Sequence, residues 1–229
     1  MKIIFIDLSL KRFEEVQSFQ ENILRKKKDG FGDDVILCSQ FYPVITLGRN
    51  AKIEDILIDE ETLKKERISL FKTNRGGGVT LHLPGQWVIY PIFDLANWKK
   101  DIKFFLSLLG NWIIKFLSLY NLKAEFDEKL PGVYIEERKI CFLGIGISKW
   151  ITLHGLSINI NPPLNYFSYI NPCGIVKLKV TSLKEELKNL PPEEDLKENL
   201  LKALENEIKN RGFSYEIVNT SPLVSQALL

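Results

Sequence analysis

Four stretches of the chain carry the residue pattern of a helix. In three of them apolar residues recur three and four positions apart, which predicts amphipathic helices, and a shorter fourth stretch is charged. The stretches are residues 10–28, 59–66, 97–120 and 193–211. The third is the longest and most apolar, so we expect its apolar side chains to face a core.

Most of the remaining apolar segments are short and bounded by glycine, proline or polar residues, as β-strands are. We predict strands at residues 35–39, 44–47, 69–73, 79–83, 86–92, 123–127, 132–135, 139–148 and 151–160. Residues 2–8 fit either a strand or an extended lead-in, and residues from 181 onward are expected to be mostly helical. Strands and helices do not alternate one by one, which favours an α+β fold, a mixed β-sheet packed with helices, over a doubly wound sheet.

The size and composition of the chain narrow its class. It has 229 residues, 45% of them hydrophobic, which is enough for one well-packed domain. We therefore expect a single domain over residues 1–229 that includes a helical segment from about 181 to 229. The formal net charge of +2 gives no sign of nucleic-acid binding.

The chain also lacks the marks of a membrane or secreted protein. No apolar run reaches the roughly 18 residues that span a bilayer, and Asp7 interrupts the apolar N-terminus, which has no cleavage site. Three widely spaced cysteines do not form a disulfide framework. We expect a cytoplasmic protein with neither a membrane nor a nucleic-acid partner.

A glycine-rich segment, RGGGVTLHLPGQWVIYPIFDL, occupies residues 75–95. The three glycines at 76–78 are not followed by the Lys-Ser or Lys-Thr of a phosphate-binding loop, and Gly144 and Gly146 are only half of a dinucleotide fingerprint. Two uses of glycines 76–78 stay open: a tight bend, or close approach of a ligand to the backbone.

The two histidines, His82 and His154, lie in strand-like segments near glycines. Each is either a structural residue or part of a site. No Cys-x-x-Cys or His-x-x-x-His spacing supplies further ligands, so we expect no metal.

Cys173 lies between a proline and a glycine and is therefore expected on a turn. It is either an exposed nucleophile or an incidental thiol. Cys38 and Cys141 lie in apolar runs and are expected to be buried. A reactive thiol needs a nearby cation to lower its pKa. The cations considered are Lys139, Lys149, His154 and Lys177.

Five motifs in a fixed order resemble the lipoyl(octanoyl) transferases. They are PVITLGR (43–49), RGGGVTLHLPGQWVIYPIFDL (75–95), RKICFLGIGISKWITLHGLSINI (138–160), NPCGI (171–175) and TSL (181–183). The resemblance covers roughly residues 10 to 210, and it implies the fold of the lipoate- and biotin-protein ligases.

The resemblance also implies an activity in lipoate biosynthesis. The family transfers an octanoyl or lipoyl group from acyl carrier protein to one lysine of a lipoyl domain, in the glycine cleavage H protein or in acyltransferase subunits of 2-oxoacid dehydrogenases. Cys173 matches the cysteine that carries the acyl thioester, and Lys139 matches the lysine that lowers its pKa. No cofactor is implied. The positions that match substrate-binding residues are Arg75, Gly76, Gly77, Gly78, Val79, Thr80, Leu81, His82, Phe142, Leu143, Gly144, Gly155, Leu156 and Ser157.

The chain departs from the family pattern at Leu83, where the family usually has glycine. We expect an apolar acyl slot whose lining includes Val79, Leu81, Leu83 and Phe142. Glycines 76–78 and 155 would let the acyl chain lie against the backbone. Backbone N–H groups of Gly77, Gly78 or Gly144 could hold the oxyanion. Arg49 and Arg75 would either form a basic rim that attracts an acidic carrier protein or take part in structural ion pairs.

Two alternatives stay open. An ATP-dependent lipoate-protein ligase has the same fold, but this chain has KICFLGI after position 138 and a cysteine that such a ligase does not need. A non-catalytic module that binds acylated carrier protein would need neither Lys139 nor Cys173.

Overall fold

The computed structural model describes residues 2–175 and 178–220, without the side chain of Cys173. The strands are β1 (Lys2–Lys11), β2 (Asp34–Phe41), β3 (Val44–Leu47), β4 (Ser69–Lys72), β5 (Val79–His82), β6 (Gln86–Ile92), β7 (Glu125–Asp127), β8 (Gly132–Ile135), β9 (Arg138–Ser148), β10 (Ile151–Asn159) and β11 (Glu216–Thr220). The α-helices are α1 (Phe13–Lys28), α2 (Glu60–Lys65), α3 (Ile102–Ser118), α4 (Leu183–Glu186) and α5 (Glu193–Asn210). Three 3₁₀ turns are η1 (Ile53–Asp55), η2 (Leu164–Tyr169) and η3 (Pro172–Gly174).

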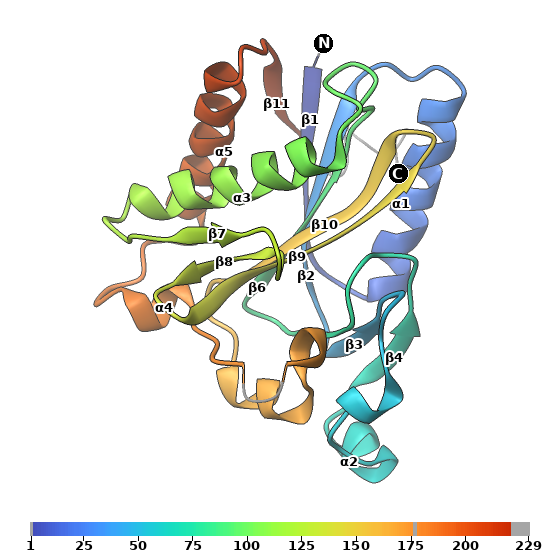
Figure 1. The fold of residues 1–229 in the computed structure, drawn as a ribbon, viewed down its shortest axis with the longest axis vertical. Coiled ribbons are helices and arrows are strands. Elements are labelled where there is room, and N and C mark those ends of the chain that lie inside the picture. Colours follow the sequence, from blue (N-terminus) through green and yellow to red (C-terminus); the bar gives the residue numbers. More distant parts are fainter. Residues whose placement is uncertain (1, 176–177, 221–229) are drawn as a thin grey trace.

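The strands form two sheets (Figure 1). The large sheet has the order β11-β1-β2-β6-β10-β9-β8-β7, in which β1 pairs parallel with both β11 and β2 and the other neighbours pair antiparallel. The small sheet has the order β4-β3-β5. The predicted mixed sheet packed with helices, an α+β fold, is confirmed.

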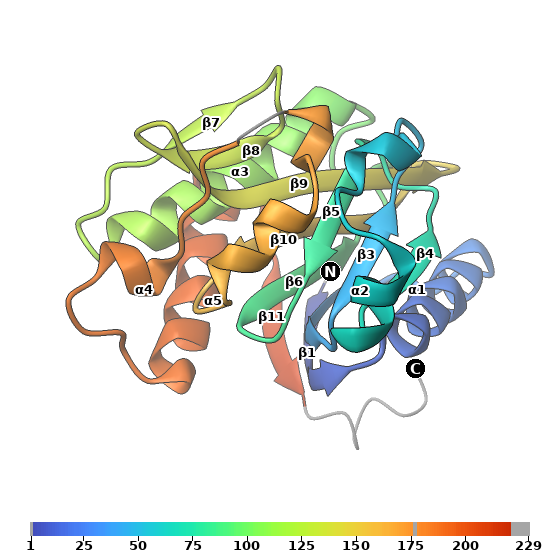
Figure 2. The same cartoon turned by 90° about the horizontal axis from the view of Figure 1, so that it is seen from below.

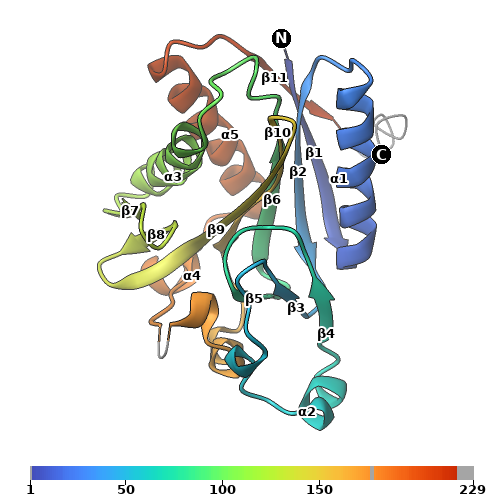
Figure 3. The same ribbon diagram turned by 45° about the vertical axis from the view of Figure 1, so that its right-hand side comes forward.

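Helices cover both faces of the large sheet (Figure 3). Successive side chains of a strand point to opposite faces. In β2, Val35 and Leu37 accordingly pack in the cluster beneath α1, whereas Ile36 and Cys38 pack in the larger cluster beneath α3 and α5. A strand with two covered faces is buried along its whole length, as every residue of β6 and β10 is, and this explains the apolar run WVIYPI in β6.

Two predicted helices begin later than their apolar pattern suggested. Asp101 caps α3 by accepting hydrogen bonds from the backbone N–H groups of Lys103 and Phe104, so the helix begins at Ile102 rather than 97. Helix α1 begins at Phe13 because residues 10 and 11 extend β1, which pairs Leu10 with Gln40 of β2.

The expectation of mostly helical structure from residue 181 is wrong for residues 216–220. They form β11, which pairs in parallel with β1 from Lys2 to Ile6. This strand depends on a partner more than 200 residues earlier in the chain, so its local sequence carries little signal.

The small sheet lies below one end of the large sheet, with α2 beyond it (Figures 2 and 3). The 3₁₀ turn η3 packs against β5, and Ile170 bridges to Ile56. The segment that carries residue 173 is therefore fastened to the small sheet. Across residues 2–175 and 178–220, no helix is long and apolar enough to cross a membrane.

Candidate active site

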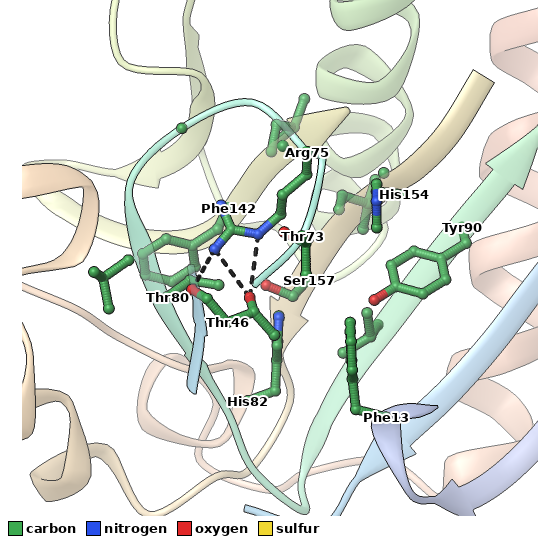
Figure 4. Close-up of a pocket in the computed structure, with 17 residues that line it drawn as sticks. Phe13, Thr46, Thr73, Arg75, Thr80, His82, Tyr90, Phe142, His154 and Ser157 are labelled. Atoms are coloured by element: carbon green, nitrogen blue, oxygen red, sulfur yellow. Dashed lines mark hydrogen bonds between the residues drawn. The ribbon is translucent and has the colours of Figure 1, made fainter. Parts of the chain in front are cut away.

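A narrow pocket lies between the large sheet and the small sheet (Figure 4). Its empty space of about 500 Å³ is partly open to solvent and is lined by 17 residues. We call it the acyl pocket. Its lining comes from six elements (α1, β3, β5, β6, β9 and β10), from the residue after β4, and from residues 75–78, which we call the glycine loop. The lining residues are Phe13, Thr46, Thr73, Arg75, Gly77, Val79, Thr80, His82, Val88, Tyr90, Phe142, Leu143, Gly144, His154, Gly155, Leu156 and Ser157.

Backbone hydrogen bonds hold the glycine loop against both sheets. Gly76 N donates to Ile145 O of β9 (2.8 Å), and residues after β3 donate to the loop carbonyls, including Gly48 N to Gly78 O (3.1 Å). Gly77 has φ +84°, a conformation that favours glycine. The loop is thus a tight bend, one of the two expected uses, and its residue 77 also lines the pocket.

Arg75 lies inside this loop and is 9% exposed. Its Nη2 donates to Thr46 O (2.6 Å) and Thr46 Oγ1 (2.9 Å) (Figure 4). Its Nη1 donates to Gly76 O (3.0 Å). The guanidinium therefore braces β3 and the glycine loop. The alternative of a surface rim that attracts an acidic partner is wrong for Arg75.

The predicted residues of β5 divide between the pocket and the core of the small sheet. Thr80, His82 and, at the start of the strand, Val79 line the pocket, although Val79 also belongs to the core cluster. Leu81 packs only in that cluster, with Ile45, Leu63 and Ile170. Leu83 follows Leu81 into that cluster, so neither leucine lines the pocket, contrary to expectation. Thr80 Oγ1 is buried without a hydrogen-bond partner in the described part of the chain.

The other residues predicted to bind substrate also divide into those that line the pocket and those that do not. Phe142, Leu143, Gly144, Leu156 and Ser157 line the pocket, as expected. Gly76 and Gly78 do not appear among the lining residues and serve the bend. Gly155 lines the pocket, but its missing side chain serves a different purpose from the one expected, because an added Cβ would overlap Ile89 O of β6.

A buried chain of side-chain amides runs from His82 toward Lys139. His82 Nδ1 donates to Gln86 Oε1 (3.3 Å), and Gln86 Nε2 donates to Asn159 Oδ1 (2.8 Å). Asn159 Nδ2 donates to Thr181 O (2.9 Å), and Thr181 N in turn donates to Lys139 O (3.0 Å). Gln86 and Asn159 are fully buried, so this network connects the pocket with the backbone of β9.

Both histidines are uncharged at neutral pH. Burial, with a smaller contribution from Arg75, lowers the pKa of His82 to about 3 and the pKa of His154 to about 4. His154 therefore cannot be the cation that activates a thiol near pH 7, and this leaves lysines for that role.

Lys139 is fully buried at the start of β9. Its Nζ donates to Leu130 O (3.3 Å) and lies 5.1 Å from the ring centre of Tyr134 and 5.0 Å from that of Phe142. The Lys139 side chain therefore does not reach outward to solvent. Lys139 does not line the pocket itself but contacts Phe142, which does.

Cys173 lies on the predicted turn, η3, in which Gly174 has φ +72°. Its side chain lies outside the described residues. The segment before it contacts the pocket wall, because the Phe167 ring stacks on Phe142 with ring centres 5.6 Å apart. Cys38 and Cys141 are buried, as predicted, and burial raises the pKa of each thiol.

Sequence reasoning assigned no pocket role to Phe13, Thr46, Thr73, Val88 and Tyr90, and it treated His154 as a possible cation rather than a wall residue. Phe13 belongs to the apolar stripe of α1 and the others lie in or next to strands, so their patterns indicated burial but not which cavity they face. In residues 2–175 and 178–220 no group of three or more His, Cys, Asp or Glu side chains could hold a metal ion.

Known proteins are similar to this chain in sequence or in fold. Residues 13–205 match the family model of the lipoyl protein ligase A/B catalytic domain. An octanoyltransferase from Parabacteroides distasonis is 41% identical over 77% of this chain and 82% of its own length.

Among solved structures, lipoate-protein ligase A bound with ATP superposes with a TM-score of 0.77 over 96% of this chain and 89% of the other, at 15% identity. A bipartite lipoate protein ligase from Thermoplasma acidophilum gives a TM-score of 0.76 over 100% and 90%, also at 15% identity. These two likenesses concern the fold.

Proposed function

The chain belongs to the lipoyl protein ligase A/B catalytic-domain family, and we propose that it is an octanoyltransferase acting through a thioester on Cys173. The donor is an octanoyl group on acyl carrier protein. The acceptor is one lysine of a lipoyl domain, in the glycine cleavage H protein or in an acyltransferase subunit of a 2-oxoacid dehydrogenase.

The contacts of Phe142 carry this proposal. Its ring lines the acyl pocket, lies beside Lys139 Nζ and stacks on Phe167, six positions before Cys173. One side chain therefore touches the pocket, the buried ammonium and the segment that leads to the cysteine. A thiolate, a cation and an apolar slot at one place are the components that acyl transfer from a thioester requires.

In the first step the Cys173 thiolate attacks the donor's carbonyl carbon. A new C–S bond forms to Cys173, the C–S bond to the carrier's pantetheine breaks, and the carrier leaves as a thiol after taking a proton from the Lys139 ammonium, which becomes a neutral amine. The Lys139 ammonium favours the attacking thiolate. Both sides of this exchange are thioesters, so neither ATP nor a metal is needed to drive it.

In the second step the acceptor lysine's amine attacks the enzyme thioester. A C–N bond forms, the C–S bond to Cys173 breaks, and Lys139 takes the amine's proton as general base. Gly77 lines the pocket, and its backbone N–H group is our proposed donor to the oxyanion of both steps. The amide product is lower in energy than the thioester.

Intact-mass spectrometry tests the thioester. Incubation of the full chain with octanoyl-acyl carrier protein is expected to add one octanoyl group, which a lipoyl domain then removes without ATP. Cys173→Ala is expected to abolish the adduct, and Cys141→Ala, which removes a buried thiol, is expected to keep it.

Two results would contradict the proposal. One is a folded Cys173→Ala protein that transfers octanoyl as fast as the wild type. The other is transfer of free lipoate that requires ATP, with no transfer from the carrier protein, which would identify an ATP-dependent ligase instead.

A further inference from the structure

A second cavity adjoins the acyl pocket at the end away from Phe142. Its empty space of about 630 Å³ is partly open to solvent, and its lining comes from α1, the end of β4 with the segment after it, and β10. We call it the outer pocket. The two cavities share Thr73 and His154 as lining residues. These two side chains form the partition between the cavities.

His154 is held firmly in this partition. Its ring Nε2 donates to Asn74 Oδ1 (2.6 Å), its backbone N donates to Gln20 Oε1 (2.7 Å), and its ring meets Tyr90 edge-on with centres 5.6 Å apart. The residue is 5% exposed and has φ +55°, which is uncommon for histidine. A strained backbone that three contacts stabilise indicates that the position of this side chain serves a function.

The partition lies opposite the reacting end of the pocket. In the β9–β10 ladder Ser157 pairs with Phe142, and His154 is three residues from Ser157 along β10. At about 3.3 Å per residue, the partition is about 10 Å from the Phe142 end. Figure 4 shows the same order, with Phe142 on one side, Ser157 between, and His154 with Tyr90 on the other. If the acyl carbonyl lies near Phe142, the methyl end of the chain points at His154.

We propose that the hydrogen bond between His154 and Asn74 closes the end of the acyl pocket and sets the longest acyl chain that the protein accepts. This inference rests on the proposed function, because it takes the pocket to hold an acyl chain. Opening the bond joins the acyl pocket to the outer pocket. The outer pocket has polar lining such as Gln17, Gln20 and Lys72, and Gln20 Nε2 has no hydrogen-bond partner within the described residues. An acyl chain that extends into the outer pocket therefore gains space but few apolar contacts, so its gain in binding free energy is limited.

The test compares chain lengths in three variants. Asn74→Ala removes the exposed acceptor of the bond and is expected to leave the fold intact, and His154→Ala removes the wall itself. Gln17→Ala is the matched control, because Gln17 lines the outer pocket but not the acyl pocket, and its side chain donates to Glu21. The ratio of kcat/KM for dodecanoyl- over octanoyl-acyl carrier protein is expected to rise at least tenfold in the first two variants and to stay within twofold in the control.

A binding measurement separates this inference from the proposed function. Calorimetry with octanoyl- and dodecanoyl-pantetheine amide analogues reports chain-length preference whether or not transfer occurs. A wild type without turnover would overturn the proposed function, yet a preference that shifts tenfold toward dodecanoyl in Asn74→Ala would still support the partition. If folded Asn74→Ala and His154→Ala both keep the wild-type preference in binding, the partition does not set chain length.

Discussion

At the scale of single residues, Gly132 and Lys139 show how one small residue makes room for a large one. A Cβ on Gly132 would overlap Lys139 Cε and would lie 2.7 Å from both Lys139 Nζ and Cys141 O. The lysine side chain therefore lies across β8 in space that only glycine leaves free. This contact explains how an ammonium can be fully buried yet directed toward Phe142.

Gly132→Ala is expected to displace the Lys139 ammonium and to slow octanoyl transfer at least tenfold. The overlap also costs on the order of 1–3 kcal/mol of stability, the usual range for overpacking. Steady-state transfer rates and urea unfolding measure the two effects. Gly32→Ala is the control, because no atom lies within 4 Å of its added Cβ. A folded Gly132→Ala protein with the wild-type rate would show that the position of the Lys139 side chain does not affect transfer.

At the scale of elements, a buried ion pair joins α1 to the large sheet. Lys27 Nζ of α1 lies 2.9 Å from Asp34 Oδ1 of β2, and both side chains are 1% exposed. Asp34 also accepts hydrogen bonds from Trp98 Nε1 (2.7 Å) and from Asp94 N (2.9 Å). Burial raises the pKa of Asp34 in spite of the opposing charge of Lys27. Trp98 in turn stacks on Tyr215 just before β11, so this carboxylate connects α1, the end of β6 and the last strand.

Lys27→Met is expected to lower the free energy of unfolding by about 3–5 kcal/mol, because it leaves the Asp34 charge buried without its cation. The double variant Lys27→Met/Asp34→Leu is expected to regain part of this loss, since it also removes the charge. Recovery is incomplete because Trp98 Nε1 and Asp94 N then lose their acceptor. Urea unfolding of the three proteins measures both changes. A double variant that is no more stable than Lys27→Met would contradict the explanation.

At the scale of the whole molecule, the buried polar groups of the site make stability depend on pH. His82 and His154 are each 5% exposed, and their pKa values in the folded protein, about 3 and about 4, lie below the ordinary value of 6.5. Below pH 6.5 the unfolded chain therefore binds protons that the folded chain does not. Their contribution is fully favourable above that pH and is lost as the pH falls toward 4.

We expect the free energy of unfolding to decrease between pH 6.5 and pH 4. Each histidine contributes up to about 1.4 kcal/mol per pH unit. Urea unfolding at a series of pH values gives the slope for the wild type and for the single variants His82→Gln and His154→Gln. Each variant is expected to have a shallower slope, because it lacks one group that takes up a proton on unfolding. Slopes that match the wild type in both variants would mean that neither histidine is held neutral in the folded protein.

Local pattern was a good guide to the elements that are covered on both faces or capped by their own sequence. The predicted bounds of β6 and β8 agree with the structure, and the family motifs predicted the lipoate-ligase fold that the comparisons confirm. The pattern also predicted the burial of Cys38 and Cys141, since each lies within an apolar run.

Positions that depend on distant partners could not be found in this way. Strand β11 depends on β1, and the buried position of Lys139 depends on Gly132. The pocket wall includes Phe13, which belongs to a helix that no motif covers. Leu81 and Leu83 were expected in the acyl pocket because they are apolar, but the small sheet turns that face of β5 toward its own core.

The amino-acid sequence by itself determined the class of elements, the family and the residue types available for acyl transfer, because periodicity and motif spacing are local properties of the chain. The tertiary structure alone decided which face of each strand meets the pocket, that both histidines stay neutral, and that His154 separates two cavities. Those properties arise from burial and from contacts between residues such as Asn74 and His154, which are 80 positions apart in the chain.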